Sequence, residues 1–344
     1  MGSLYAKVPI HHTHFNIIVC YRWWVAANAS QNSAIYVGEK IFTQTKLETD
    51  RLRNVFKFLL GNLPKDMTTN DLIDIKDLLP IDRYILHCLT LHCRKVDEFY
   101  NGFNYNKVVL QTQNFVASRL SAFYFDLVKD RLYCDFGSSK ERKSVNTVLF
   151  HVLNNLQTSI SPILPVLCRE VSLHSNLFQN ANEESNLLYQ YSTDADWINE
   201  QLKIQIELLL DLKEMIKTSV AEATNTTNIS TKDLNKLGLV FMPLRDDTRI
   251  LENISCNEIR EIFQVSNIEI CHSEMEWMRK TEDIVPECFV NAQPNTTIFH
   301  ENSGVKVKIY QSNYKLCPRC RLYSCDTNSD DESLCIRCDN VLKM

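Results

Sequence analysis

Glycine is scarce in this sequence. The chain has 344 residues and 7 glycines, whereas an average protein of that length has about 24. The glycine-rich loops that cradle nucleotide phosphates, G-x-G-x-x-G and G-x-x-x-x-G-K, do not occur. This absence argues strongly against a nucleotide site of either kind. It also favours helices, because glycine destabilises a helix interior.

The sequence also lacks an excess of positive charge and any long apolar run. Its formal net charge is −5, which argues against non-specific electrostatic binding by the whole molecule but leaves room for a local basic patch. No apolar run approaches the length of a membrane span, so we expect no membrane partner. Residues 1–20 show neither the apolar core of a signal peptide nor the arginine-rich pattern of a transit peptide.

Cysteine, by contrast, is abundant, with 13 in the chain. Most cysteines lie singly within apolar helical runs, where a buried free thiol behaves as a small apolar side chain. Five others cluster in the last thirty residues. Disulfides in a secreted protein are the alternative, but this distribution favours a reducing, intracellular compartment.

The stretch Leu120–Cys134 has the spacing of a helix with a wide apolar arc. Its apolar positions recur at steps typical of one helix face: Val109, Val116, Leu120, Phe123 and Leu127, flanked by Tyr124, Val128 and Leu132. A helix apolar over so wide an arc is expected to be a central member of a bundle. Asp126 precedes Lys129 by three residues and Asp130 adjoins Arg131, which predicts a solvated cluster of charges.

Similar apolar patterns predict further long helices joined by short connections. The predicted helices are 39–63, one opened by Pro80, one from near Asn104 through Cys134, 140–171 interrupted by Pro162 and Pro165, and 194–223. Three cations, Arg51, Arg53 and Lys57, lie off the apolar stripe of the first helix. Residues 225–229 are predicted to form a turn, and Val305–Tyr310 alternates as a strand does. The pattern predicts a mainly α protein with an antiparallel helical bundle.

Two C-x-x-C pairs close the sequence. Cys317 and Cys320 form the first pair, and Cys335 and Cys338 the second, with fourteen residues between the pairs. Four thiolates at this spacing predict a tetrahedral zinc site, which is structural because no ligand position stays open for water. Few apolar side chains lie nearby, so the metal supplies stability that a core cannot. Cys325 is the odd cysteine, either free or a replacement for Cys320.

The two C-x-x-C pairs have two alternative interpretations. A pair of disulfides is disfavoured by the compartment. A redox C-x-x-C is disfavoured because no βαβ pattern surrounds either pair.

Several phrases of this sequence resemble isoleucyl-tRNA synthetases, which are class I aminoacyl-tRNA synthetases. They are Y-R-W-W-V-A-A from Tyr21, R-N-V-F-K-F-L-L-G-N-L from Arg53, S-A-F-Y-F-D-L-V-K-D-R-L-Y from Ser121, S-P-I-L-P from Ser161, and the terminal four cysteines. The resemblance is strong over Tyr21–Val171 and Cys317–Cys338. It is loose between them, where T-N-T-T-N-I-S-T-K-D-L replaces the family's Gly-x-x-Leu-Glu-Ala-like phrase.

The resemblance implies a C-terminal, anticodon-binding portion of such an enzyme, of the bacterial or mitochondrial type. It implies an antiparallel helical bundle, a small α/β subdomain and a C-terminal zinc ribbon. The expected divisions are an unmatched leader (1–20), a remnant of the catalytic-domain junction (21–46), the anticodon-binding bundle (47–200), the α/β subdomain (201–312) and the zinc module (313–344).

The same resemblance implies that the chain binds tRNA(Ile), with the zinc module helping to hold the anticodon end. Arginines fixed on a metal-clamped turn suit contacts with phosphates and bases. The candidate RNA contacts are Arg319, Arg321, Arg337, Lys315, Arg51, Arg53 and Lys57.

The catalytic phrases of the family are missing from this sequence. Neither H-I-G-H nor K-M-S-K-S occurs, so no catalytic residue is assigned. ATP would be bound only by a catalytic core, which a separate chain or a longer protein would supply. The alternative is a non-catalytic helical-bundle and zinc-ribbon module, derived from a synthetase, that binds RNA or protein. The expected location is the mitochondrial matrix for a eukaryotic protein and the cytoplasm otherwise.

Overall fold

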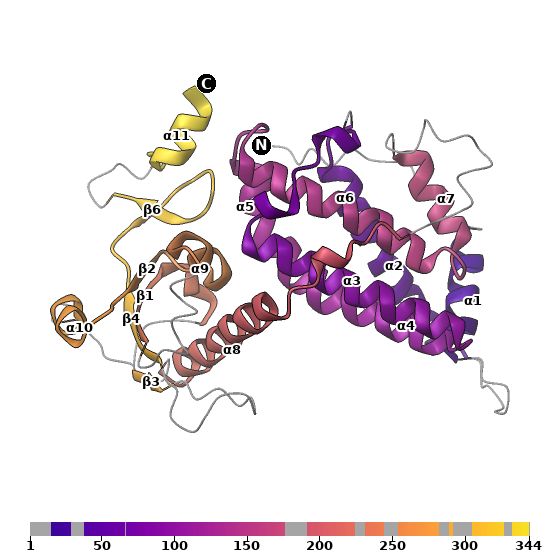
Figure 1. Ribbon diagram of the computed structural model, residues 1–344, viewed down its shortest axis with the longest axis horizontal. Helices are drawn as coiled ribbons and strands as arrows, with labels where there is room; N and C mark the ends of the chain where they lie inside the picture. The colour runs from indigo at the N-terminus through magenta and orange to yellow at the C-terminus, as the bar shows by residue number, and fades with distance from the viewer. Residues whose placement is uncertain are drawn as a thin grey trace. The chain divides into compact units, whose positions relative to one another are not determined.

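The computed structural model is mainly helical, with small sheets in the C-terminal part (Figure 1). The structure describes residues 15–28, 38–65, 67–175, 191–223, 231–243, 254–281, 289–291, 305–326 and 332–343. The chain forms two compact units: Met1–Leu132 with Gly137–Asn199, and Tyr133–Phe136 with Glu200–Met344. The prediction of a mainly α protein is confirmed.

The first unit is built from helices. They are α1 (Phe15–Asn28), α2 (Glu39–Asn62), α3 (Pro80–Asn101), α4 (Tyr105–Asn114), the π-helix η3 (Phe115–Tyr124), α5 (Phe125–Cys134), α6 (Lys140–Ile160) and α7 (Pro165–His174), with short 3₁₀ turns η1 (Thr69–Asp71), η2 (Ile75–Asp77) and η6 (Ala195–Trp197). The helices predicted at Glu39, Pro80, Asn104 and Lys140 begin within a residue of those positions.

The stretch Leu120–Cys134, predicted to be a central member of the bundle, is amphipathic. It exposes Ser121, Ala122, Asp126 and Lys129. The helix with the most extensive burial in the first unit is α6, in which every residue from 144 to 150 is buried. Helix α3 packs against both α4 and α6. The first unit therefore builds its core around α3 and α6.

The predicted third helix contains an irregular segment that periodicity did not indicate. In η3 the backbone follows the wider π-helical pattern between two α-helical parts. The wider turn changes which side chains of this segment face the core, so Tyr124 is fully buried and Phe123 is only half-buried. The 3.6-residue spacing had predicted the opposite order for these two residues.

A buried carboxylate joins four helical segments of the first unit. Asp82 on α3 accepts hydrogen bonds from both guanidinium nitrogens of Arg131, at 2.8 and 3.1 Å, and from the Tyr124 hydroxyl at 2.7 Å. The Ser144 hydroxyl on α6 also donates to it. Asp82 is 0% exposed and Arg131 1%. The prediction that Arg131 belongs to a solvated cluster is therefore wrong, whereas the exposed Asp126–Lys129 pair, 2.9 Å apart, is confirmed.

Arg53 is also buried, contrary to its predicted position off the apolar stripe of α2. Its guanidinium group lies 3.4 Å from the carboxylate of Glu170 on α7. The long side chain thus reaches across to a neighbouring helix, and the ion pair allows its charge to be buried.

The S-P-I-L-P phrase ends one helix and begins another. Helix α6 ends at Ile160, and α7 begins with Pro165 at its first position. Proline is tolerated there because a backbone N–H at the first position of a helix has no hydrogen-bond partner within the helix. Arg22 on α1 donates from Nε to the carbonyl of Ile163 (2.6 Å) and from Nη2 to that of Pro162 (2.9 Å). The predicted interruption is confirmed, but it separates two helices instead of kinking one.

The second unit contains helices and two small sheets. Its elements are α8 (Glu200–Ala223), η7 (Thr231–Lys236), β1 (Leu237–Pro243), α9 (Cys256–Phe263), β2 (Asn267–Ile270), α10 (Glu274–Thr281), β3 (Phe289–Asn291), β4 (Val305–Gln311), β5 (Lys315–Leu316), β6 (Tyr323–Cys325) and α11 (Ile336–Lys343). The strand predicted at Val305–Tyr310 is confirmed. The helix predicted from Asp194 begins at Glu200, and the turn predicted at 225–229 lies outside the described residues.

The larger sheet has the strand order β2-β1-β4-β3. Strands β1 and β2 are parallel and joined through α9, while β4 is antiparallel to both β1 and β3. Gly238 on β1 faces Tyr310 on β4, and a Cβ atom at Gly238 would lie 2.2 Å from the tyrosine ring. One of the seven glycines is thus needed for close packing. No helix in the described part of the chain is long and apolar enough to cross a membrane.

The Asp82 cluster yields a prediction about stability. Arg131→Met would leave the Asp82 carboxylate buried without its cation, which should lower the free energy of unfolding by about 3–5 kcal/mol. Urea unfolding followed by tryptophan fluorescence measures the change, because three of the four tryptophans, Trp23, Trp24 and Trp197, lie in the first unit.

The matched control for this prediction is Lys129→Met, which removes an exposed ion pair and should cost less than about 1 kcal/mol. The double variant Asp82→Asn with Arg131→Met should recover much of the lost stability, because no uncompensated charge remains. An Arg131→Met loss no larger than that of the control would contradict the role assigned to this pair.

Candidate metal centre

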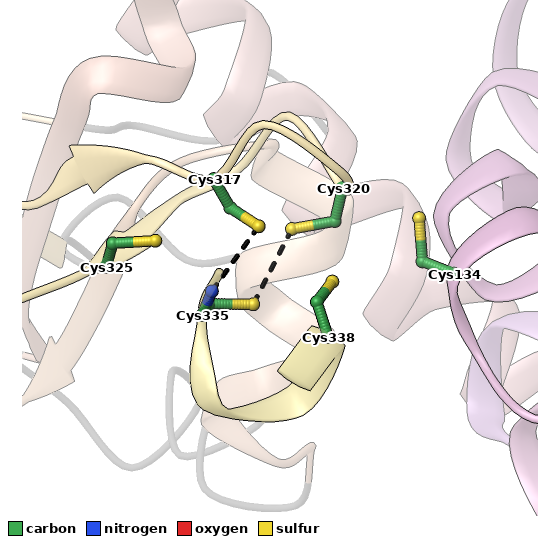
Figure 2. Packing of buried hydrophobic residues seen from close by; sticks show 6 residues of the cluster. All are labelled: Cys134, Cys317, Cys320, Cys325, Cys335 and Cys338. Atoms are coloured by element: carbon green, nitrogen blue, oxygen red, sulfur yellow. Dashed lines mark hydrogen bonds between the residues drawn. The ribbon is translucent and has the colours of Figure 1, made fainter. Parts of the chain in front are cut away.

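The four cysteines of the two C-x-x-C pairs come together at the C-terminal end of the second unit (Figure 2). Cys317 directly follows β5 and Cys320 ends the turn after it, whereas Cys335 precedes α11 and Cys338 lies in its first turn. The first turn is closed by two backbone bonds, from the Arg321 amide to the carbonyl of Cys317 (3.0 Å) and from the Cys317 amide to that of Leu322 (2.9 Å).

The sulfur atoms of these cysteines are close enough to share one ion. Their four Sγ atoms all lie within 4.8 Å of one another, and those of Cys320 and Cys335 are 3.8 Å apart. A disulfide needs a sulfur–sulfur distance of about 2.05 Å, and all four thiols are free. All four residues are buried. Among the described residues, this is the single group of three or more histidine, cysteine or acidic side chains that could hold a metal ion.

The electrostatics of the group call for a cation. Burial raises the pKa of the Cys320 thiol, and the neighbouring Cys335 raises it further. Burial also raises the pKa of Cys338. At Cys317 burial acts in the same direction, but amide donors from Cys335, Cys320 and Arg319 outweigh it and bring the pKa down to about 6. One thiolate is thus stabilised by the backbone alone, and a bound metal ion would stabilise the others.

Cys325 lies outside the group of four. Its sulfur donates to the carbonyl of Ser333 at 3.4 Å. Burial, followed by the proximity of Cys317, raises its pKa to about 11. Cys325 and Cys134 lie on either side of the group in Figure 2. Both pack against the four cysteines as small apolar side chains.

The candidate RNA-contact residues of the second unit have different surroundings. Arg321 is exposed, and its backbone has a left-handed φ of 62° directly after Cys320. Lys315 is half-buried on β5. Arg319 donates from Nη1 to the carbonyl of Cys134 at 2.9 Å, and Arg337 lies 3.4 Å from the carboxylate of Asp135. Arg319 and Arg337 therefore already bind acceptors within their own unit.

The candidates of the first unit also differ from one another. Arg51 and Lys57 are exposed on α2, while Arg53 is buried against Glu170. Sequence reasoning also missed Asp135 and the carbonyl of Cys134 as parts of the metal centre's surroundings. No local signal could have indicated them, because 185 residues separate Cys134 from Arg319.

Comparison with known proteins defines the class of this chain. The family described as "Anticodon-binding domain of tRNA ligase" matches residues 82–237. That range begins at Asp82, includes α5, α6 and α8, and ends at the start of β1. Residues 82–237 are therefore similar to the anticodon-binding domains of tRNA ligases.

The individual relatives are isoleucine–tRNA ligases. The mitochondrial enzyme of Macaca fascicularis is 27% identical over 93% of this chain, the enzyme of Symbiobacterium thermophilum 28% over 93%, and the mitochondrial enzyme of Schizosaccharomyces pombe 29% over 93%. These matches cover 32%, 33% and 32% of the relatives, so the chain spans about a third of their length. The chain is thus similar to isoleucine–tRNA ligases over nearly its whole length.

The geometry of the four thiols predicts one bound metal ion per chain. Cys335→Ser and Cys338→Ser should each lose most of the metal, because three thiolates with a hydroxyl form a weaker soft-ligand site. Elemental analysis of the purified, dialysed chain measures the metal content. Cys325→Ser is the matched control and should retain it. Full metal retention in both Cys335→Ser and Cys338→Ser would disprove the assignment.

Proposed function

We propose that this chain is the tRNA-binding, C-terminal portion of an isoleucine–tRNA ligase. In this proposal it recognises the anticodon arm of tRNA(Ile) during ATP-dependent aminoacylation, and a catalytic core outside residues 1–344 carries out the chemistry. The observation that carries the proposal is the match of residues 82–237 to the anticodon-binding domain, together with four thiols gathered at the other end of the chain.

The domain organisation implied by the sequence resemblance would accompany this function. Residues 21–46 would form the junction with a catalytic core, 47–200 an antiparallel helical bundle, 201–312 an α/β subdomain and 313–344 the metal module. The packing of α3 against α4 and α6 supports the bundle. The mixed sheet of β1 to β4 supports the α/β subdomain.

The metal in the proposal is zinc, held by Cys317, Cys320, Cys335 and Cys338. Zinc–sulfur bonds of about 2.3 Å in a tetrahedron place neighbouring sulfurs about 3.8 Å apart. The Cys320 and Cys335 sulfurs have that separation. Four protein ligands complete the coordination shell, so the ion would stabilise the fold of the module and take no part in catalysis.

The RNA contacts in the proposal come from exposed cations. Arg321 on the metal module and Arg51 and Lys57 on α2 are exposed, and their charges suit phosphate oxygens. Lys315 is half-buried and would contribute through its terminal amine. Arg319, Arg337 and Arg53 are each held by an acceptor in the chain, so they are the weaker candidates.

The proposed location follows from the same relatives, which include mitochondrial and bacterial enzymes. A eukaryotic source would place the protein in the mitochondrial matrix, and a bacterial source in the cytoplasm.

RNA binding is the first test of this proposal. The zinc-loaded chain should protect the anticodon arm of tRNA(Ile) in footprinting, and its affinity should fall steeply with salt because phosphate contacts release counterions. Arg321→Gln should weaken binding and reduce the slope of log affinity against log salt by about 1. An unrelated tRNA serves as the control.

Absence of protection at low salt would contradict the tRNA-binding proposal for this chain. It would favour the alternative of a synthetase-derived module that binds a protein.

The second test concerns the reaction itself. Residues 1–344 alone should give no isoleucine-dependent ATP–pyrophosphate exchange, because adenylate formation needs groups that hold the triphosphate and stabilise its developing charge. The sequence has neither the glycine-rich loops nor the H-I-G-H and K-M-S-K-S phrases that supply them. A complete isoleucine–tRNA ligase is the positive control. Clear exchange by the isolated chain would show that the active site has been misplaced.

A further inference from the structure

Both halves of the metal centre have an arginine at the same position. The first knuckle reads C-P-R-C over residues 317–320 and the second C-I-R-C over residues 335–338, so Arg319 and Arg337 both directly precede the second cysteine of a pair. A metal-clamped turn fixes the backbone of the residues between its ligands. The starting points of both arginine side chains are therefore determined by the metal centre.

The two arginines reach adjacent residues of one short segment. Arg319 Nη1 donates to the carbonyl oxygen of Cys134 at 2.9 Å, and Arg337 Nη1 lies 3.4 Å from Oδ1 of Asp135. The acceptors belong to Tyr133–Phe136, which forms part of the second unit. Each arginine of the repeated pattern thus has its own acceptor, and the two acceptors are consecutive in the chain.

The chemistry of this segment suits a guanidinium group. Cys134 is the last residue of α5, and the final carbonyl groups of a helix have no partner within the helix. A cation beside the Cys134 carbonyl satisfies that acceptor within the second unit. Asp135 adds a full negative charge one residue later.

These contacts are shielded from solvent. The side chain of Asp135 is 12% exposed and that of Arg337 37%, while Cys134 is buried and Arg319 half-buried. Arg319 thus connects the first knuckle to Cys134 through its side chain. Partly buried, charge-assisted bonds of this kind hold position better than exposed ion pairs do.

We propose that Arg319 and Arg337 are positioning residues that anchor the metal centre on residues 133–136, and that Arg321 is the arginine of the knuckles that faces RNA. The second half of this statement rests on the proposed tRNA-binding function, whereas the first half does not. The arginine of each C-x-R-C pattern therefore attaches the module to residues 133–136. The exposed Arg321, which follows the first pair, is available to contact RNA.

The anchor is tested on the zinc-loaded full chain without RNA. Asp135→Asn and Arg337→Gln should each release zinc to a chromogenic chelator about five-fold faster than the unaltered chain. Both should also increase hydrogen exchange of the amides at 317–322 and 335–339. The charge-swap variant, Asp135→Arg with Arg337→Asp, should restore slow release. The control is Glu214→Gln, which removes the exposed pair with Lys217 on α8 and should change neither quantity.

Release and exchange equal to those of Glu214→Gln in both single variants would overturn the anchor. The same holds if the charge swap is no slower in release than the single variants. Conservative Arg337→Lys keeps the charge and should remain close to the unaltered chain, which separates loss of the ion pair from misfolding.

The RNA half is tested by the salt dependence of binding to an anticodon stem-loop RNA of tRNA(Ile). Arg319→Gln and Arg337→Gln should weaken binding with an unchanged salt slope, whereas Arg321→Gln should reduce the slope by about 1. A slope reduced by about 1 in Arg319→Gln would overturn its positioning role and make it a phosphate contact. If the unaltered chain binds no RNA, the proposed function fails while the zinc-release result still decides the anchor.

Discussion

The packing of the first unit depends on one buried carboxylate. Asp82 accepts from Arg131, Tyr124 and Ser144 and so connects α3, the end of η3, α5 and α6. A charge at 0% exposure is tolerated only with a cation and well-placed donors, so these segments have one permitted relative placement. The same requirement determines which face of the η3–α5 stretch is buried, since Tyr124 and Arg131 must both point toward α3. The residues matched by the anticodon-binding domain begin at this aspartate.

The C-terminal module relies on a different kind of constraint. Its cluster consists of cysteines with Leu322 and Leu334 partly buried against it, which is little apolar surface for an independent fold. Metal coordination would supply the missing stability, and two arginines of the knuckles contact residues 134 and 135. The first unit contains a buried ion pair within a large apolar core. The C-terminal module has little apolar core and would be stabilised by a metal ion bound to its four cysteines.

Residue spacing predicted the elements better than it predicted the side-chain environments. Local apolar periodicity predicted the helices beginning at Glu39, Pro80 and Lys140 and the strand at Val305. It does so because the spacing of apolar residues indicates the type of element and its buried face. The π-helical segment at 115–124 was missed because its wider pattern arises from packing and changes which of its own side chains are buried, as Phe123 and Tyr124 show. The cysteine group was predicted from sequence because its ligand spacing is a local property of two short turns.

What the sequence alone determined was therefore the mainly helical class, the positions of most elements and the residues able to form a metal site. Only the tertiary structure decided which charges are buried and which are exposed. Arg131, Arg53 and Arg319 find their partners 49, 117 and 185 residues away. A buried charge is stabilised by groups that the fold brings to it, and no pattern within a single helix or turn records those groups.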